Sequence, residues 1–119
     1  MKILFVGDVT GEAGLEKVQQ ELGRLRRQYE SDLVIVNGEN AAERNGITEK
    51  QFRALRFAGA DVVTLGNHAW ANQDIYNFID REEALVRPYN YPEGTPGRGY
   101  SIVDMGRLQV AVVNLLGNV

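Results

Sequence analysis

Apolar residues along the chain gather in short runs separated by longer amphipathic stretches. Three runs, at 3–6, 33–36 and 62–65, and a shorter one at 84–86 have the length expected of β-strands. Strands that are apolar at successive positions, instead of at every second position, are typical of parallel sheets covered on both faces. The pattern therefore predicts a parallel sheet whose strands, including 3–6, are buried on both sides.

Two of the segments between these runs have helical periodicity. After a loop at 8–14, apolar residues recur three or four positions apart, which predicts an amphipathic helix. These residues are Leu15, Val18, Leu22, Leu25 and Tyr29. A capping box at 48–51 predicts the start of a second helix, which ends at Gly59. The buried side of this second helix is predicted to comprise Phe52, Leu55, Phe57 and Ala58.

A third helix is predicted between the last two apolar runs, with Asn72 or Asp74 as its cap. It would bury Ile75, Phe78 and Ile79. The predicted order of elements up to residue 86 is therefore βαβαβαβ, an α/β arrangement.

The remaining residues predict a loop followed by a hairpin. Segment 87–99 is rich in proline, glycine and tyrosine, as loops are. Apolar stretches at 100–103 and 108–115 flank the turn at 104–107, which favours an antiparallel hairpin. Because the last strand leads into no further element, we expect residues 1–119 to form one domain that is the amino-terminal part of something longer.

Composition narrows the classes of function. The net charge of −3 argues against an extended nucleic-acid groove, and phosphate chemistry would need the help of a cation. The absence of cysteine excludes disulfides, zinc–thiolate sites and thiol nucleophiles, and is compatible with a reducing cytoplasm. With no run of membrane-spanning length, we expect a cytoplasmic protein without membrane contact, and homo-oligomerisation stays open.

Polar side chains that can bind metals follow three of the predicted strands. Asp8 follows the first, Glu39 and Asn40 the second, and Asn67 and His68 the third. The carboxyl ends of parallel strands meet at one edge of a sheet, so these five residues should converge. Two carboxylates brought together repel unless a cation lies between them, and oxygen ligands with one nitrogen donor suit Mn²⁺, Mg²⁺ or Fe.

Three sequence blocks that contain these residues resemble a known family. Residues 7–8, 37–40 and 66–68, with their spacing, are similar to the amino-terminal blocks of the calcineurin-like metallophosphoesterases. Glu39-Asn40 in place of the usual Asp, together with 87–92 and 114–117, resembles the YmdB-like branch. The resemblance implies the αββα layered fold of that superfamily, of which this chain would supply the βαβαβαβ half and a hairpin.

The resemblance also implies a hydrolase, a two-metal phosphodiesterase or phosphatase for small phosphate diesters such as cyclic nucleotides. Asp8, Glu39 and Asn67 would hold two divalent ions, manganese, iron or magnesium. Asn40 and His68 would contact the phosphate, and His68 would also be catalytic, stabilising the transition state or protonating the leaving alkoxide. The ions would activate the attacking hydroxide.

Two departures from the superfamily pattern bear on activity. Thr10 stands where most members have a histidine, as expected for the YmdB-like branch. The family also supplies metal-binding histidines from its second half, whereas His68 is the only histidine in the 119 residues. We therefore predict that this chain does not complete a high-affinity two-metal site by itself, and whether it is active alone stays open.

Other interpretations of the same residues stay open. Asp8, Asn67 and His68 are also residue types of turns and helix caps. The aromatic residues Trp70, Tyr89 and Tyr91 are interpreted as packing groups and not as base-stacking groups. A non-catalytic nucleotide-binding module, or a structural α/β fragment, is the alternative function, although the glycines after the first strand do not have the spacing of a dinucleotide-binding loop.

Overall fold

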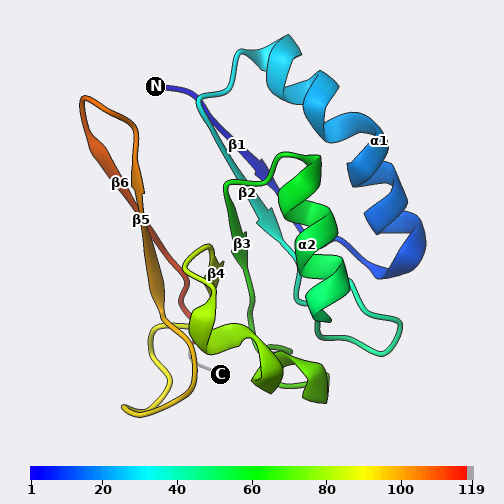
Figure 1. Cartoon of the computed structure of the whole chain (residues 1–119), viewed down its shortest axis with the longest axis vertical. Coiled ribbons are helices and arrows are strands. Elements are labelled where there is room, and N and C mark those ends of the chain that lie inside the picture. The colour runs from blue at the N-terminus through cyan, green and yellow to red at the C-terminus, as the bar shows by residue number, and fades with distance from the viewer. Residues whose placement is uncertain (118–119) are drawn as a thin grey trace.

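A computed structural model describes residues 1–117 and contains a parallel sheet, two α-helices and a separate hairpin (Figure 1). The strands β1 (Ile3–Val6), β2 (Leu33–Asn37), β3 (Val62–Thr64) and β4 (Leu85–Val86) are adjacent in this order and all parallel. The antiparallel hairpin pairs β5 (Tyr100–Asp104) with β6 (Gln109–Val113). The predicted α/β class, parallel sheet and hairpin are confirmed.

The sheet lies between two different layers. The helices α1 (Gly11–Tyr29) and α2 (Glu49–Ala58) cover one face, and the hairpin lies against the other (Figure 1). Alternate residues of β2 separate into two apolar clusters, because successive side chains of a strand point to opposite faces. Val34 and Val36 join the helix-side cluster, whereas Leu33 and Ile35 join the cluster that includes Val112 of the hairpin.

Strand β1 differs from the prediction that it is buried on both faces. It is an edge strand, and among the described residues the hairpin-side cluster does not extend over it. Ile3 and Phe5 are therefore 49% and 58% exposed, whereas Leu4 and Val6 pack against the helix-side cluster. An uninterrupted apolar run indicates that a strand can be covered on both faces of the sheet. It does not indicate whether a second layer actually packs on that strand.

The helices confirm the predicted elements with altered boundaries. Helix α1 begins at Gly11 and not after a loop at 8–14. The capping box of α2 is present: the Thr48 hydroxyl accepts a hydrogen bond from Gln51 N, the Gln51 side chain accepts one from Thr48 N, and Gly59 ends the helix. Phe57 was predicted to be buried but is 95% exposed, because its position lies off the face shared by Phe52 and Leu55.

The third predicted helix is not an α-helix. Its place is taken by two short 3₁₀ helices, η1 (Gln73–Asn77) and η2 (Ile79–Arg81), with Phe78 outside helical geometry between them. Asn72 caps η1, accepting a hydrogen bond from Asp74 N. Because the residues predicted to be buried, Ile75, Phe78 and Ile79, are three or four positions apart, either helix type buries all of them. No helix within residues 1–117 is long and apolar enough to cross a membrane.

Candidate active site

The loops that follow β1, β2 and β3 meet at one edge of the sheet and are bound to each other through their backbones. The amide of Val9 donates to Asn37 O at 3.1 Å, and that of Gly11 donates to Asn40 O at 2.9 Å. On the other side, Gly38 N donates to Thr64 O at 2.9 Å. The parallel register thus brings the three strand ends together, as the strand-end rule predicts.

Four of the five predicted site residues form one chain of hydrogen bonds at this edge. Asn40 Nδ2 donates to Asp8 Oδ1 at 2.6 Å, and His68 Nδ1 lies 2.6 Å from Asn40 Oδ1. The backbone amide of His68 donates to Glu39 Oε2 at 2.9 Å. The predicted convergence of Asp8, Glu39, Asn40 and His68 is therefore present, while the chemical role of each residue stays a prediction.

The orientation of Asn40 favours one tautomer of His68. An ionised Asp8 carboxylate only accepts hydrogen bonds, so the amide nitrogen of Asn40 must face it. The amide oxygen then faces His68 and needs a donor, so the Nδ1 atom of the imidazole carries a proton. The remaining ring nitrogen, Nε2, has no hydrogen-bond partner within residues 1–117.

Glu39 lies in a space that exists because residue 66 is glycine. A Cβ atom at Gly66 would fall 2.3 Å from Glu39 Oε1 and 2.5 Å from Oε2. The Glu39 side chain is 16% exposed, and its Oε2 atom is 3.8 Å from His68 Nδ1. Gly66 therefore admits a largely covered carboxylate next to the imidazole.

Asp8 is exposed and occupies an unusual backbone conformation. Its φ of 50° lies in the left-handed region, which costs most residues about 1 kcal/mol or more, although Asp and Asn tolerate it best. The carbonyl of Asp8 accepts a hydrogen bond from the Thr10 hydroxyl at 3.2 Å. This turn directs the chain from β1 into α1 with the Asp8 carboxylate beside Asn40.

Asn67 is not part of the hydrogen-bonded chain. It is exposed in the turn that contains His68, and its side chain has no hydrogen-bond partner within residues 1–117. The structure thus places Asn67 at the same edge without joining it to the other four residues.

The donor atoms at this edge suit a hard or borderline divalent cation. Two carboxylates and two amide side chains lie beside one imidazole, and the Gly66 space holds the Glu39 carboxylate where a bulkier residue would displace it. Within the described part of the chain, His, Asp and Glu side chains do not form a group of three arranged around one ion. The edge therefore fits a divalent metal by donor type, while the role of each residue as a ligand stays a prediction.

The two loops that carry the site also pack directly on one another away from it. A Cβ atom at Gly46 would lie 2.7 Å from the backbone nitrogen of Asn72, so this contact requires glycine, as does the φ of 79° at Gly46. Gly46 N also donates to the backbone oxygen of Glu39 at 2.5 Å. The segment after Glu39 is thereby held against the segment after His68.

Ion pairs extend this contact from α2 to the 3₁₀ helices. The Asp74 carboxylate accepts from Glu49 N at 2.8 Å, and the Glu49 carboxylate accepts from Arg53 and Arg81 at 3.1 and 2.7 Å. Hydrogen bonds from Arg81 and Arg53 lower the pKa of Glu49 below its ordinary value of 4.5. The backbone hydrogen bond from Glu49 lowers the pKa of Asp74 below 3.8, with help from Asn77.

Two residues that support the site could not be assigned a role from the sequence alone. Gly66 admits Glu39, and Asn114, which follows β6, donates from its side chain to the backbone oxygen of Leu65. The only signal for Asn114 was its place in block 114–117, which carries part of the family resemblance. Its contact with Leu65 depends on the hairpin packing across the sheet.

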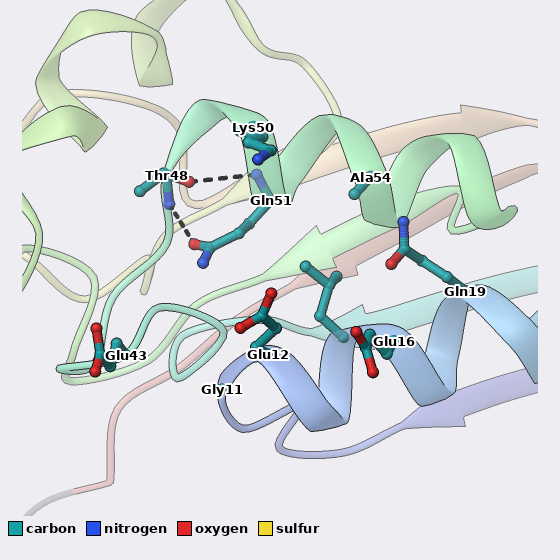
Figure 2. A pocket seen from close by; sticks show the side chains of 10 residues that line it. Gly11, Glu12, Glu16, Gln19, Glu43, Thr48, Lys50, Gln51 and Ala54 are labelled. Carbon is teal, nitrogen blue, oxygen red and sulfur yellow. Dashed lines mark hydrogen bonds between the residues drawn. The ribbon is translucent and has the colours of Figure 1, made fainter.

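A large cavity lies elsewhere. Its volume is about 690 Å³, and it lies between the outer faces of α1 and α2, with Glu12, Glu16 and Lys50 on its walls (Figure 2). None of the five predicted site residues lines it. We therefore locate the candidate active site at the open edge of the sheet and not in this interhelical cleft.

Known proteins resemble this chain in sequence and in fold. The chain is 46% identical over 117 residues to the 2′,3′-cyclic-nucleotide 2′-phosphodiesterase of Bacillus subtilis (strain 168), in a match that covers 98% of this chain and 44% of that protein. Its fold matches the crystal structure of a novel phosphatase from Mycoplasma pneumoniae with a TM-score of 0.89 and 32% identity, over 98% of this chain and 43% of that one.

A crystal structure of a hypothetical protein from Thermus thermophilus matches equally well, with a TM-score of 0.89 and 46% identity, over 98% of this chain and 45% of that one. The chain thus spans less than half the length of each of these relatives. The neighbouring phosphatase structure confirms the predicted metallophosphoesterase-type fold. The profile of the YmdB-like protein family matches residues 4–119, and the chain belongs to that family.

Proposed function

We propose that this chain forms the amino-terminal part of a metal-dependent phosphodiesterase that hydrolyses small phosphate diesters such as cyclic nucleotides. The observation that carries the proposal is the hydrogen-bonded chain from Asp8 through Asn40 to His68, with Glu39 beside it. The names of the relatives, a cyclic-nucleotide phosphodiesterase and a phosphatase, support the same class of reaction.

Asp8, Glu39 and Asn67 would hold the divalent ions in the complete site. Bound there, the ions would neutralise the diester charge and lower the pKa of a coordinated water. The fit rests on donor chemistry and on the Gly66 space that admits the Glu39 carboxylate. The proposed metal is manganese, iron or magnesium.

Asn40 and His68 would act on the phosphate itself. The Asn40 nitrogen carries two hydrogens, and one of them is donated to Asp8. We assign the second to a phosphate oxygen. With Nδ1 of His68 held as a donor to Asn40, the general-acid role requires the imidazolium form of the ring, in which Nε2 also carries a proton and passes it to the leaving alkoxide.

The intact mass of the natural protein is recorded first, to establish the length of its chain. An assay of hydrolysis by that protein then tests the metal mechanism. With Mn²⁺ and 2′,3′-cyclic AMP, Glu39→Gln should lower kcat/KM by about 100-fold or more. The matched control is Glu43→Gln, an exposed glutamate of the same loop, which should leave kcat/KM unchanged. Activity that survives both a chelator and Glu39→Gln would contradict the proposal.

A comparison of leaving groups tests His68. Replacement of His68 by Ala should slow hydrolysis of the cyclic nucleotide about 100-fold, within the usual contribution of a general acid. The loss should be much smaller with bis(4-nitrophenyl) phosphate, because nitrophenolate leaves without a proton. Equal losses on both substrates would remove the general-acid role.

The chain alone provides an independent measurement. Calorimetric titration of the 119-residue polypeptide with Mn²⁺ should show no tight stoichiometric binding of two ions, because no downstream histidine is present in its sequence. Tight binding of two ions would overturn the prediction that the site is incomplete. Nucleotide binding by the natural protein without any hydrolysis would favour the non-catalytic alternative.

A further inference from the structure

A second cavity, of about 530 Å³, is formed by the loop between β4 and β5 and by the first residue of β5. Three tyrosines line it, Tyr89, Tyr91 and Tyr100, together with Arg98. Its volume lies in the range of small-molecule sites. Tyr89 and Tyr91, which the sequence predicts to be packing groups, line this cavity.

Two of these tyrosines keep much of their surface uncovered. Tyr89 is 57% exposed and Tyr100 is 49% exposed, and their ring centroids are 6.4 Å apart at an interplanar angle of 55°. Large aromatic side chains in a fixed loop usually bury more of their area. Each ring therefore presents a surface to the cavity that no described residue fully covers.

The backbone that carries these rings is held in place. Tyr89 N donates to Asn114 O at 2.8 Å. A Cβ atom at residue 99 would lie 2.5 Å from Tyr89 Cα, so Gly99 permits the close approach of the loop to β5. A platform that is already positioned loses little conformational entropy when a ligand binds.

Two separate contacts connect the walls of the cavity to the segment that carries His68. Tyr91 meets Trp70 edge to face at 5.9 Å between ring centroids, and Trp70 lies in the turn closed by the hydrogen bond from Ala71 N to His68 O. Asn114, which binds Tyr89, also donates to the backbone oxygen of Leu65, three positions before His68.

Arg98 adds a cation to the aromatic lining. Its nearest carboxylate partner is Glu83 at 3.8 Å, and the Glu83 side chain is 84% exposed, so this pair binds weakly. Aromatic faces next to a guanidinium group favour a flat, aromatic ligand with polar edges. A nucleobase has this chemistry, whereas a simple alkyl phosphate does not.

We propose that the Tyr89–Tyr91–Tyr100 cavity is a nucleobase subsite, which holds the base of a nucleotide whose phosphate lies at the Asp8–Asn40–His68 edge. Tyr89 and Tyr100 provide the stacking surface, and Arg98 contacts the polar edge of the base. The inference rests on the proposed function, because it assigns the phosphate of the same ligand to that site.

Nuclear magnetic resonance titration of the 119-residue chain tests the subsite with two probes, adenosine 2′-monophosphate and ribose 5-phosphate. The adenosine nucleotide should bind at least about 5-fold tighter, the lower range expected for stacking of one base. Its amide shifts should map to residues 89–100. A ratio near one, or shifts that map to the cleft between α1 and α2, would overturn the inference.

Substitutions identify the stacking groups. Tyr89→Ala should weaken adenosine 2′-monophosphate binding by about 5- to 100-fold, whereas Tyr89→Phe, which keeps the ring, should retain it. The matched control is Tyr29→Ala, a tyrosine of α1 that is 53% exposed, which should change nothing. If Tyr89→Ala does not fold, Tyr100→Ala carries the same test, and unchanged binding in the folded variant would contradict the subsite.

Glu39→Gln separates this inference from the proposed function. The variant should lose hydrolysis and keep its preference for the adenosine nucleotide over ribose 5-phosphate. Base binding without hydrolysis in the natural protein would retain the subsite and reject the enzyme proposal. If cyclic nucleotides are hydrolysed and neither Tyr89→Ala nor Tyr100→Ala changes KM, the enzyme proposal is retained and the subsite is rejected.

Discussion

Gly66 controls the position of the Glu39 carboxylate, so its replacement should affect function more than stability. In Gly66→Ala the new methyl group would overlap Glu39 Oε1, which can move because it is the end of a flexible side chain. We expect the free energy of unfolding to change by less than about 1 kcal/mol. Metal-dependent hydrolysis should fall about 100-fold, because misplacing a catalytic group by about 1 Å lowers the rate by about that factor.

The displacement in Gly66→Ala can also be observed without an activity assay. The amide proton signal of His68, which is bound to Glu39 Oε2, should shift. The control is Gly23→Ala in α1, where the nearest atom to the new Cβ is 3.5 Å away. It should stabilise the protein by about 0.5–1 kcal/mol and leave the His68 signal in place. An unaltered His68 signal in Gly66→Ala would show that Glu39 has not moved.

At the scale of residues, the strand-end rule identified which side chains meet, but not how they are connected. Asp8, Glu39, Asn40 and His68 were predicted at one edge because each follows an apolar run. The order of their hydrogen bonds depends on loop conformations, such as the φ of 50° at Asp8. Nothing local to the sequence determines these loop conformations, because they arise from packing between segments distant in the chain.

Helix α2 depends on its N-cap residue, Thr48, more than α1 depends on its N-cap residue, Thr10. Thr48 accepts a hydrogen bond from Gln51 N, whereas Thr10 at the start of α1 makes no capping bond. Thr48→Ala should therefore lower the free energy of unfolding by about 0.5–2 kcal/mol. Thr10→Ala should change it by less than about 0.5 kcal/mol. Urea denaturation measures both, and equal effects would contradict a role for the box.

The ion pairs between α2 and the 3₁₀ helices should make stability depend on acid. The pKa values of Glu49 and Asp74 are lowered in the folded protein from their ordinary values of 4.5 and 3.8. Their contribution is therefore fully present above those values and is lost as the pH falls through the lower, folded values. Glu49→Gln should flatten the decline in stability as the pH falls below the ordinary glutamate pKa of 4.5.

Urea unfolding at a series of pH values measures this slope. Glu16→Gln, an exposed glutamate of α1, is the control and should follow the natural profile. A Glu49→Gln profile as steep as that of the natural chain would mean that other carboxylates cause the acid dependence.

At the scale of elements, periodicity predicted the type and order of most segments. It did not distinguish the α-helix predicted after Asn72 from the two 3₁₀ helices, because both bury residues three or four positions apart. It also assigned Phe57 to the core, since apolar character alone does not determine the helix face that meets a neighbour.

One face of β6 packs against the sheet. Val112 is 7% exposed in the hairpin-side cluster, whereas its neighbour Val113 is 52% exposed. Val112→Ala should lower the free energy of unfolding by about 2 kcal/mol, the value of two buried methyl groups with a cavity term. Val113→Ala should change it by less than about 0.5 kcal/mol. Thermal denaturation distinguishes the two, and equal losses would mean that the layer is held differently.

The layered arrangement of the whole molecule was only partly predictable. The sheet and the hairpin were both expected, but their packing was not, and so β1 was assigned a second covered face that Ile3 and Phe5 do not have. The covering of a face depends on contacts between segments far apart in sequence, such as Ile35 with Val112 in one cluster. Patterns of neighbouring residues contain little information about such contacts.

The hydrogen bond from Asn114 to Leu65 also bears on the order in which the protein is assembled. It joins residues 49 positions apart, and the bonds of Asn40 to Asp8 and His68 span 32 and 28 positions. Contacts of such separation require closure of long loops and form slowly compared with helices. On the ribosome, which releases the amino terminus first, the five candidate site residues of this chain have all been synthesised by position 68. The hydrogen bond from Asn114 to the backbone oxygen of Leu65 cannot form until residue 114 has emerged.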